Sequence, residues 1–234
     1  MRKANRITLW GVLLALTFLL SPTLGQGTSE LGRFQKVQSL LDKGELVAHW
    51  VGQGRVAGDI VELTLDNTTE EAIAITLESG TVLVLEDEEL AREFQPILLE
   101  ETVTLLVPAQ GSTTRMLRGY CLEYELEPPA KGREFPYRFP PDTVAYQPAL
   151  DVLEASLTYD AEKNVLPVQR QRTVVIQRAI WAALGQMTKE KLLEDIYLDA
   201  ASEKKTLSRR QAERIANVIW EEVQRLLAMR SLKD

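Results

Sequence analysis

The chain has 234 residues, of which 45% are hydrophobic and 26% charged, and its formal net charge is −7. This acidic balance argues against a nucleic-acid partner, because phosphate binding requires a positive field. Cys121 is the only cysteine, which excludes an intramolecular disulfide. The core must therefore be stabilised by burial alone.

Residues 1–25 have the pattern of a secretory signal peptide. A basic start precedes an apolar run over 9–20, and a Ser-Pro break with small residues follows. The run is shorter than the ~20 residues that a membrane-spanning helix needs, so we expect cleavage, after Gly25, and not retention as an anchor. The sequence thus predicts a secreted or periplasmic protein with no stable membrane insertion after cleavage.

The next segments change from helical to strand periodicity. Residues 26–44 predict a short N-terminal helix that ends at Gly44. Alternating apolar residues between turn signals then predict strands within 59–87, 96–108 and 113–126. Short strands in this order indicate an antiparallel sandwich or barrel, because a parallel sheet needs a helix at each crossover. We interpret residues 45–127 as an antiparallel, immunoglobulin-like β-sandwich.

The C-terminal half is predicted to be helical. A proline-rich stretch at 128–148 is expected to be a loop, because proline interrupts regular structure. Residues 149–234 follow with helical periodicity, clearest over 207–229, and are expected to pack on the sandwich. The predicted fold class is therefore α+β, with an N-terminal sandwich and a helical C-terminal part.

The usual signatures of enzymes and metal sites are missing. The glycine-rich stretch around Gly52 has neither the Lys-Ser/Thr ending nor the strand-then-helix frame of a phosphate-binding loop. His49 is the only histidine and has no metal-binding partners nearby, so we predict no metal and no cofactor. A thiol nucleophile made of Cys121 with His49 as its base lacks a motif around either residue. We therefore assign no catalytic residue and expect no enzyme.

Two residues stand out from the patterns that surround them. In the stretch VVIQRAIWAAL at 174–184, helical spacing puts Gln177 on an apolar face with Ile180 and Trp181. In the strand within 113–126, alternation puts Cys121 on the polar side of the strand. A bulge near Gly119 would be needed to turn it inward.

The strings YCLE at 120–123 and IQRAIW at 176–181 resemble two motifs of the bacterial thioester domains of surface adhesins. In that family a Cys on a strand is joined to a Gln on a later helix. The resemblance implies an internal thioester between Cys121 and Gln177, formed with loss of ammonia and open to attack by an amine on a ligand. The residues that would form its supporting shell are Tyr120, Ala179, Ile180 and Trp181.

Two functions remain open from the sequence. A thioester survives only where water is excluded, and the apolar neighbours of Gln177 meet that need. We therefore predict a binding or adhesion module without turnover, whose partner is a protein or an amine-bearing surface ligand. The alternative is a non-covalent structural or protein-interaction domain of the cell envelope. In that case Cys121 and Gln177 are only packing residues, the amide being satisfied by hydrogen bonds.

Overall fold

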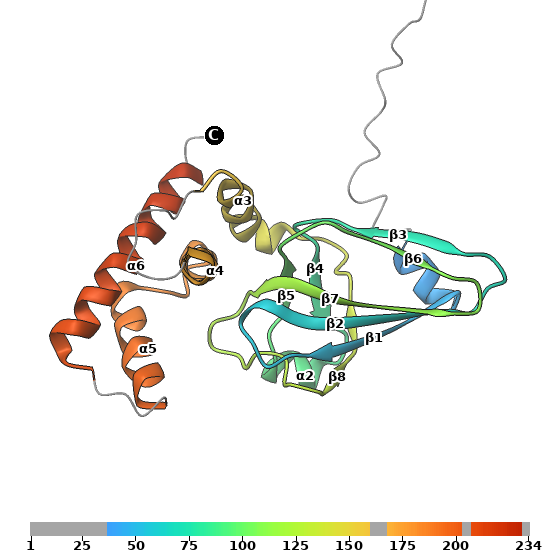
Figure 1. Ribbon diagram of the computed structural model, residues 1–234, viewed down its shortest axis with the longest axis horizontal. Helices are drawn as coiled ribbons and strands as arrows, with labels where there is room; N and C mark the ends of the chain where they lie inside the picture. The colour runs from blue at the N-terminus through green and yellow to red at the C-terminus, as the bar shows by residue number, and fades with distance from the viewer. Residues whose placement is uncertain (1–36, 160–167, 203–206, 231–234) are drawn as a thin grey trace, which may run out of the picture.

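The computed structural model describes residues 37–159, 168–202 and 207–230 (Figure 1). The predicted signal peptide and the first part of the predicted N-terminal helix lie outside the described residues, while 37–42 are helical. The described chain combines an antiparallel sheet with α-helices, which confirms the mixed class predicted from the sequence. None of the helices in the described ranges is long and apolar enough to cross a membrane.

The main sheet has seven antiparallel strands in the order β8-β1-β2-β7-β5-β4-β9. Their bounds are β1 (Leu46–Gly52), β2 (Ala57–Asn67), β4 (Val82–Leu85), β5 (Ile97–Leu99), β7 (Ser112–Cys121), β8 (Glu134–Phe135) and β9 (Tyr137–Arg138). The two outer strands, β8 and β9, are consecutive and only Pro136 separates them. Since β8 pairs with β1 and β9 pairs with β4, this one segment nearly closes the sheet. A separate two-stranded ladder joins β3 (Ile73–Leu77) to β6 (Val103–Val107).

The immunoglobulin-like sandwich predicted from the sequence is not confirmed. The two strands that bring the edges of the main sheet together, β8 and β9, lie in the proline-rich stretch, which was predicted to be a loop. Pro136 has no backbone N–H to donate. It lies between the paired residues of β8 and those of β9, at a position where the sheet needs no N–H donor. Its carbonyl instead accepts from the backbone N–H of Glu86, at 3.0 Å. Two-residue strands on either side of a proline carry no alternation that a sequence pattern could reveal.

The end of β7 is buried on both faces. Gly119, Tyr120, Cys121 and Leu122 are all buried, and α4 (Val168–Ala183) contributes contacts from outside the sheet. The prediction that Cys121 needs a bulge near Gly119 in its own strand is wrong. The register shift lies in β2, between Asp59 and Val61. One side of this end of β7 faces the hydrophobic core, and the helices cover the other side. Because both sides are buried, the alternation of side chains does not separate an inner from an outer side here.

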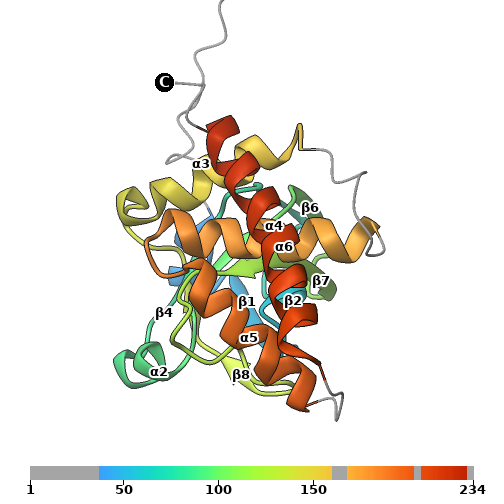
Figure 2. The same cartoon turned by 90° about the vertical axis from the view of Figure 1, so that its left-hand side faces the viewer.

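Four helices follow the sheet: α3 (Gln147–Ser156), α4, α5 (Lys189–Ser202) and α6 (Arg209–Arg230). Two shorter ones, α2 (Glu88–Glu93) and the 3₁₀ helix η1 (Val144–Tyr146), lie in loops. Helix α4 packs against β2 and lies between the sheet and α6 (Figure 1). Seen from the helical side, α6 crosses α4 on the face away from the sheet (Figure 2). The apolar stripe of α6 is buried there, through Ala212, Ala216, Ile219, Val223 and Leu226.

A methyl group at Gly119 should destabilise the protein, because β5 approaches the backbone there. An added Cβ would lie 2.5 Å from the carbonyl oxygen of Leu98. We expect Gly119→Ala to lower the free energy of unfolding by about 1–3 kcal/mol, the usual range for overpacking. Urea denaturation measures this loss. Gly111→Ala is the control, because its nearest contact is a proline side-chain atom at 3.2 Å, and equal losses in the two variants would contradict the close approach.

Candidate functional site

The side chain of Gln177 binds the backbone of Cys121 at two points. Its Oε1 accepts from the Cys121 N–H at 3.1 Å, and its Nε2 donates to the Cys121 carbonyl at 2.8 Å. Both residues are buried, with 2% of Gln177 and 0% of Cys121 exposed. The structure therefore brings together the two residues that the sequence singled out, although 56 positions separate them.

The contact forms where β2 stops pairing with β7. Ala57, the first residue of β2, is opposite Tyr120, so the backbone groups of Cys121 lie at the end of this ladder. The Cys121 N–H also donates to the carbonyl of Val56, at 2.9 Å. A primary amide carries one acceptor and two donors, and can take the place of a missing strand residue. Gln177 thus satisfies buried groups that would otherwise lack a complete set of partners.

Two further glutamines hold the segment that follows Cys121. Gln95 accepts from the N–H of Glu123 at 3.1 Å and donates to the carbonyl of Leu126 at 2.6 Å. Gln186 accepts from the N–H of Tyr124 at 2.8 Å. Sequence reasoning missed both residues. Gln95 follows Phe94 and precedes a buried strand. An amide among apolar residues is therefore the sequence signal that could have identified it.

The end of α4 positions Gln186. Gly185 has φ +75, and the backbone N–H of Gln186 donates to the carbonyl of Trp181 at 2.8 Å. This is the pattern of a helix that ends on a left-handed residue, which glycine adopts without a Cβ penalty. Gly185 therefore ends the helix and also allows the next residue to place its amide against the strand end.

The Cys121 thiol is deeply buried. Its Sγ lies 3.9 Å from the carbonyl oxygen of Arg55. Alternation along β7 puts its side chain on the same side as Leu117, which belongs to the core. Burial raises the pKa of the Cys121 thiol well above its ordinary value. A free thiol at this position is therefore protonated at neutral pH and is a poor nucleophile.

The predicted supporting residues are buried around this contact. Tyr120, Ala179 and Ile180 are fully buried, and Trp181 is nearly so. The Trp181 ring packs edge-on against Tyr124, with 5.2 Å between the ring centroids. Its Nε1 has no hydrogen-bond partner among the described residues. The surroundings are thus largely apolar, as a water-sensitive bond requires. The Trp181 ring, however, packs on Tyr124, in the segment after Cys121.

His49 belongs to a different part of the molecule's surface. Its Nδ1 lies 2.7 Å from a carboxylate oxygen of Glu134, and its Nε2 lies 3.3 Å from Asp66. The hydrogen bond with Glu134 raises the pKa of His49. Both ring nitrogens contact carboxylates, so neither is available to act as a base for Cys121. Among the described residues no group of His, Cys, Asp and Glu side chains could hold a metal ion.

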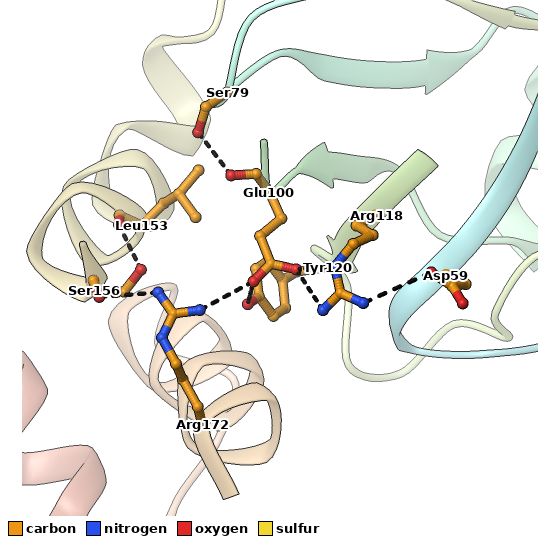
Figure 3. A network of polar contacts seen from close by, with 8 residues as sticks. All are labelled: Asp59, Ser79, Glu100, Arg118, Tyr120, Leu153, Ser156 and Arg172. Atoms are coloured by element: carbon orange, nitrogen blue, oxygen red, sulfur yellow. Dashed lines mark hydrogen bonds and ion pairs between the residues drawn. The ribbon is translucent and has the colours of Figure 1, made fainter. Parts of the chain in front are cut away.

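A buried carboxylate joins the sheet to the helices next to this site (Figure 3). Glu100 accepts from the Tyr120 hydroxyl at 2.9 Å and forms ion pairs, each at 3.1 Å, with Arg118 of β7 and Arg172 of α4. Arg172 also donates to the carbonyl of Ser156 in α3, at 3.0 Å. Burial and the Glu100 carboxylate raise the pKa of Tyr120, so its hydroxyl keeps the proton that it donates. Sequence reasoning missed this network, because it joins isolated charges from three segments.

A cleft of about 800 Å³ opens between α4 and the start of β2. Gln177 lies in its lining, together with Val56 and Gly58 on the β2 side. The arginines that line it are Arg55, Arg118, Arg172 and Arg178. A second cleft, of about 880 Å³, is lined by Trp50 and the 136–143 segment and includes neither Cys121 nor Gln177. Of these two clefts, the first is the one that reaches Gln177.

Removing the Gln177 amide should cost more stability than removing an exposed one. In Gln177→Leu the Cys121 carbonyl loses its amide donor in a buried position, and such groups cost roughly 1–3 kcal/mol each. We expect a loss in this range in the free energy of unfolding, measured by chemical denaturation. Gln147→Leu removes an exposed amide that binds only Asp151, so its effect should stay within about 0.5 kcal/mol. Similar effects in both variants would mean that Gln177 contributes little to the docking of α4.

Comparisons with known proteins give no match, whether with protein-family models, with curated proteins or with solved structures. The arguments for a function therefore come from the two motifs and from the geometry around Cys121 and Gln177.

Proposed function

We propose that this protein is a binding module without turnover that captures amines covalently through an internal thioester between Cys121 and Gln177. The observation that carries the proposal is that the Gln177 amide is hydrogen-bonded to the backbone of Cys121 in a buried position. The motifs around them resemble those of bacterial thioester domains, where a strand Cys and a helix Gln form the bond. Here Cys121 ends β7 and Gln177 lies in α4, as that arrangement requires.

The chemistry needs no external reagent to form the bond. The Sγ of Cys121 attacks the side-chain carbonyl carbon of Gln177, the C–N bond breaks, and the nitrogen leaves as ammonia with the thiol proton. A ligand amine then attacks the same carbon, forms an amide and returns the thiol to Cys121. In both steps negative charge develops on Oε1, which the Cys121 N–H already approaches at 3.1 Å. A backbone donor aimed at such an oxygen stabilises the transition state.

Burial and access are both compatible with this chemistry. Water is kept from the pair because Cys121 and its neighbours Tyr120 and Ile180 are fully buried. Gln177 nevertheless lines the cleft beside α4, so it is the member of the pair that an incoming amine would reach. The signal-peptide pattern at 1–25 supports a secreted or periplasmic setting, where the partner would be a protein or another amine-bearing surface ligand.

A second candidate function is a non-covalent interaction domain of the cell envelope. The hydrogen bonds of Gln177 favour it, because both polar atoms of the amide bind the Cys121 backbone and not the thiol. On this proposal Gln177 is a structural residue that docks α4 onto β7, and binding uses the surface alone. The Cys121 side chain would then be a small core residue.

Intact mass separates the two candidates. If the thioester forms, the purified mature protein should weigh one ammonia less than its sequence, and methylamine should raise the mass by one methylamine. Neither change should occur in Cys121→Ala or Gln177→Ala. A mass equal to the sequence, unchanged by methylamine, would rule out covalent capture in that preparation and leave the non-covalent domain.

Thiol accessibility provides an independent check. With a thioester, Cys121 should resist iodoacetamide in the folded protein and also immediately after unfolding in guanidinium chloride at neutral pH, and methylamine treatment should be needed before it is alkylated in the unfolded chain. With a free thiol, burial and the raised pKa should block alkylation only while the protein is folded. Stoichiometric labelling of the unfolded, untreated chain would therefore contradict the thioester.

A further inference from the structure

The cleft beside Gln177 carries the opposite sign of charge from the chain as a whole. Four arginines line it, and among the described residues Asp59 is the only acidic one in its lining. The whole chain has a formal net charge of −7. A local excess of guanidinium groups on an acidic protein concentrates positive potential within one hollow, where anions are attracted.

Three of the four arginines already have carboxylate partners. Arg118 and Arg172 share Glu100, and Arg178 pairs with Asp195 at 2.6 Å. These pairs fix the guanidinium groups in the wall of the cleft, and Figure 3 shows Arg118 and Arg172 on either side of Glu100. Asp59 lies 3.6 Å from Arg118. The pairs therefore hold the wall in place but leave one positive charge without a carboxylate partner in the part of the chain that the structure describes.

That charge belongs to Arg55. It is exposed in the turn between β1 and β2, it lines the cleft, and it forms no ion pair with any described residue. Its backbone carbonyl is the group that lies 3.9 Å from the Cys121 thiol. The residue with the uncompensated charge is thus adjacent in space to the Cys121–Gln177 contact.

We propose that this cleft is a binding site for an anionic group, a carboxylate or a phosphate, with Arg55 as its principal ligand. Planar guanidinium groups bind both anions through paired, charge-assisted hydrogen bonds. Arg118 and Arg172, held by Glu100, form a fixed wall of N–H donors beside Arg55, although their charges are offset by Glu100 and Asp59. This inference extends the proposed function by naming the chemistry of the ligand, but it requires only the cleft and not the thioester.

Titration calorimetry with two anions that lack an amine tests the proposal. The probes are inorganic phosphate and glutarate, each compared with sodium chloride at the same ionic strength. We expect saturable binding to at least one probe, weakened about tenfold in Arg55→Gln, as the loss of one charge-assisted hydrogen bond implies. Arg115→Gln is the matched control, because Arg115 is exposed on β7 but does not line the cleft, and binding should change less than twofold.

The outcomes are distinct. Stronger binding of phosphate would identify a phosphorylated ligand, and stronger binding of glutarate would identify a carboxylate-bearing one, and each supports the proposal. Absence of saturable binding to both probes would overturn it, as would equal weakening by the Arg55 and Arg115 substitutions. Neither probe can react with a thioester, so failure of covalent capture in the mass experiment would leave this result unaffected.

Discussion

The two-point hydrogen bond between Gln177 and the Cys121 backbone is the constraint on which the relation of sheet and helices depends. β2 pairs with β7 only as far as Tyr120, and the next residue needs a partner for its buried carbonyl. A side chain from α4 supplies it. Because such a carbonyl is costly to leave unpaired, the helix is fixed in register and distance against the strand end.

The Glu100 network fixes α4 at a second point, through ion pairs instead of a neutral amide. A carboxylate with 12% of its side chain exposed has lost most of its water, and two arginines and a tyrosine hydroxyl replace that water. Buried ion pairs add little net stability compared with apolar packing, but removing one partner leaves a charge unpaired. The network therefore acts chiefly to select one docking position for α4 and α3 against β7.

The sequence predicted those features that repeat along the chain. The stripe of α6 recurs at helical spacing over about four turns, so it could be identified without knowing what it packs on. Gln177 was identifiable because it breaks an apolar pattern. The closing segment around Pro136 could not be identified from the sequence, because it pairs with β1 and β4, which lie far away along the chain.

The charged part of the site could not be predicted for a related reason. Glu100, Arg118 and Arg172 each look like ordinary surface residues in their own segments, and only the fold brings them together. Sequence alternation also misassigned Cys121, since it assumes that one face of a strand meets water. At the end of β7 neither face does, because α4 covers the side that would otherwise be exposed.

The same hydrogen bonds bear on the products that a thioester at this position would give. In the amide state Gln177 donates an N–H to the Cys121 carbonyl. A thioester has no such donor, so that carbonyl would lose its partner at a cost of about 1–3 kcal/mol. Attack by a primary amine would leave one N–H on the nitrogen, but in a trans secondary amide this N–H points away from the edge that carries Oε1, so only the cis amide could donate to the Cys121 carbonyl while Oε1 keeps its own contact. Hydrolysis would instead place a carboxylate against a buried carbonyl oxygen, with no donor between them, which is unfavourable in a site this dry. The strand end would thus disfavour the acid, and it would bind the amide product at both points only in its cis form.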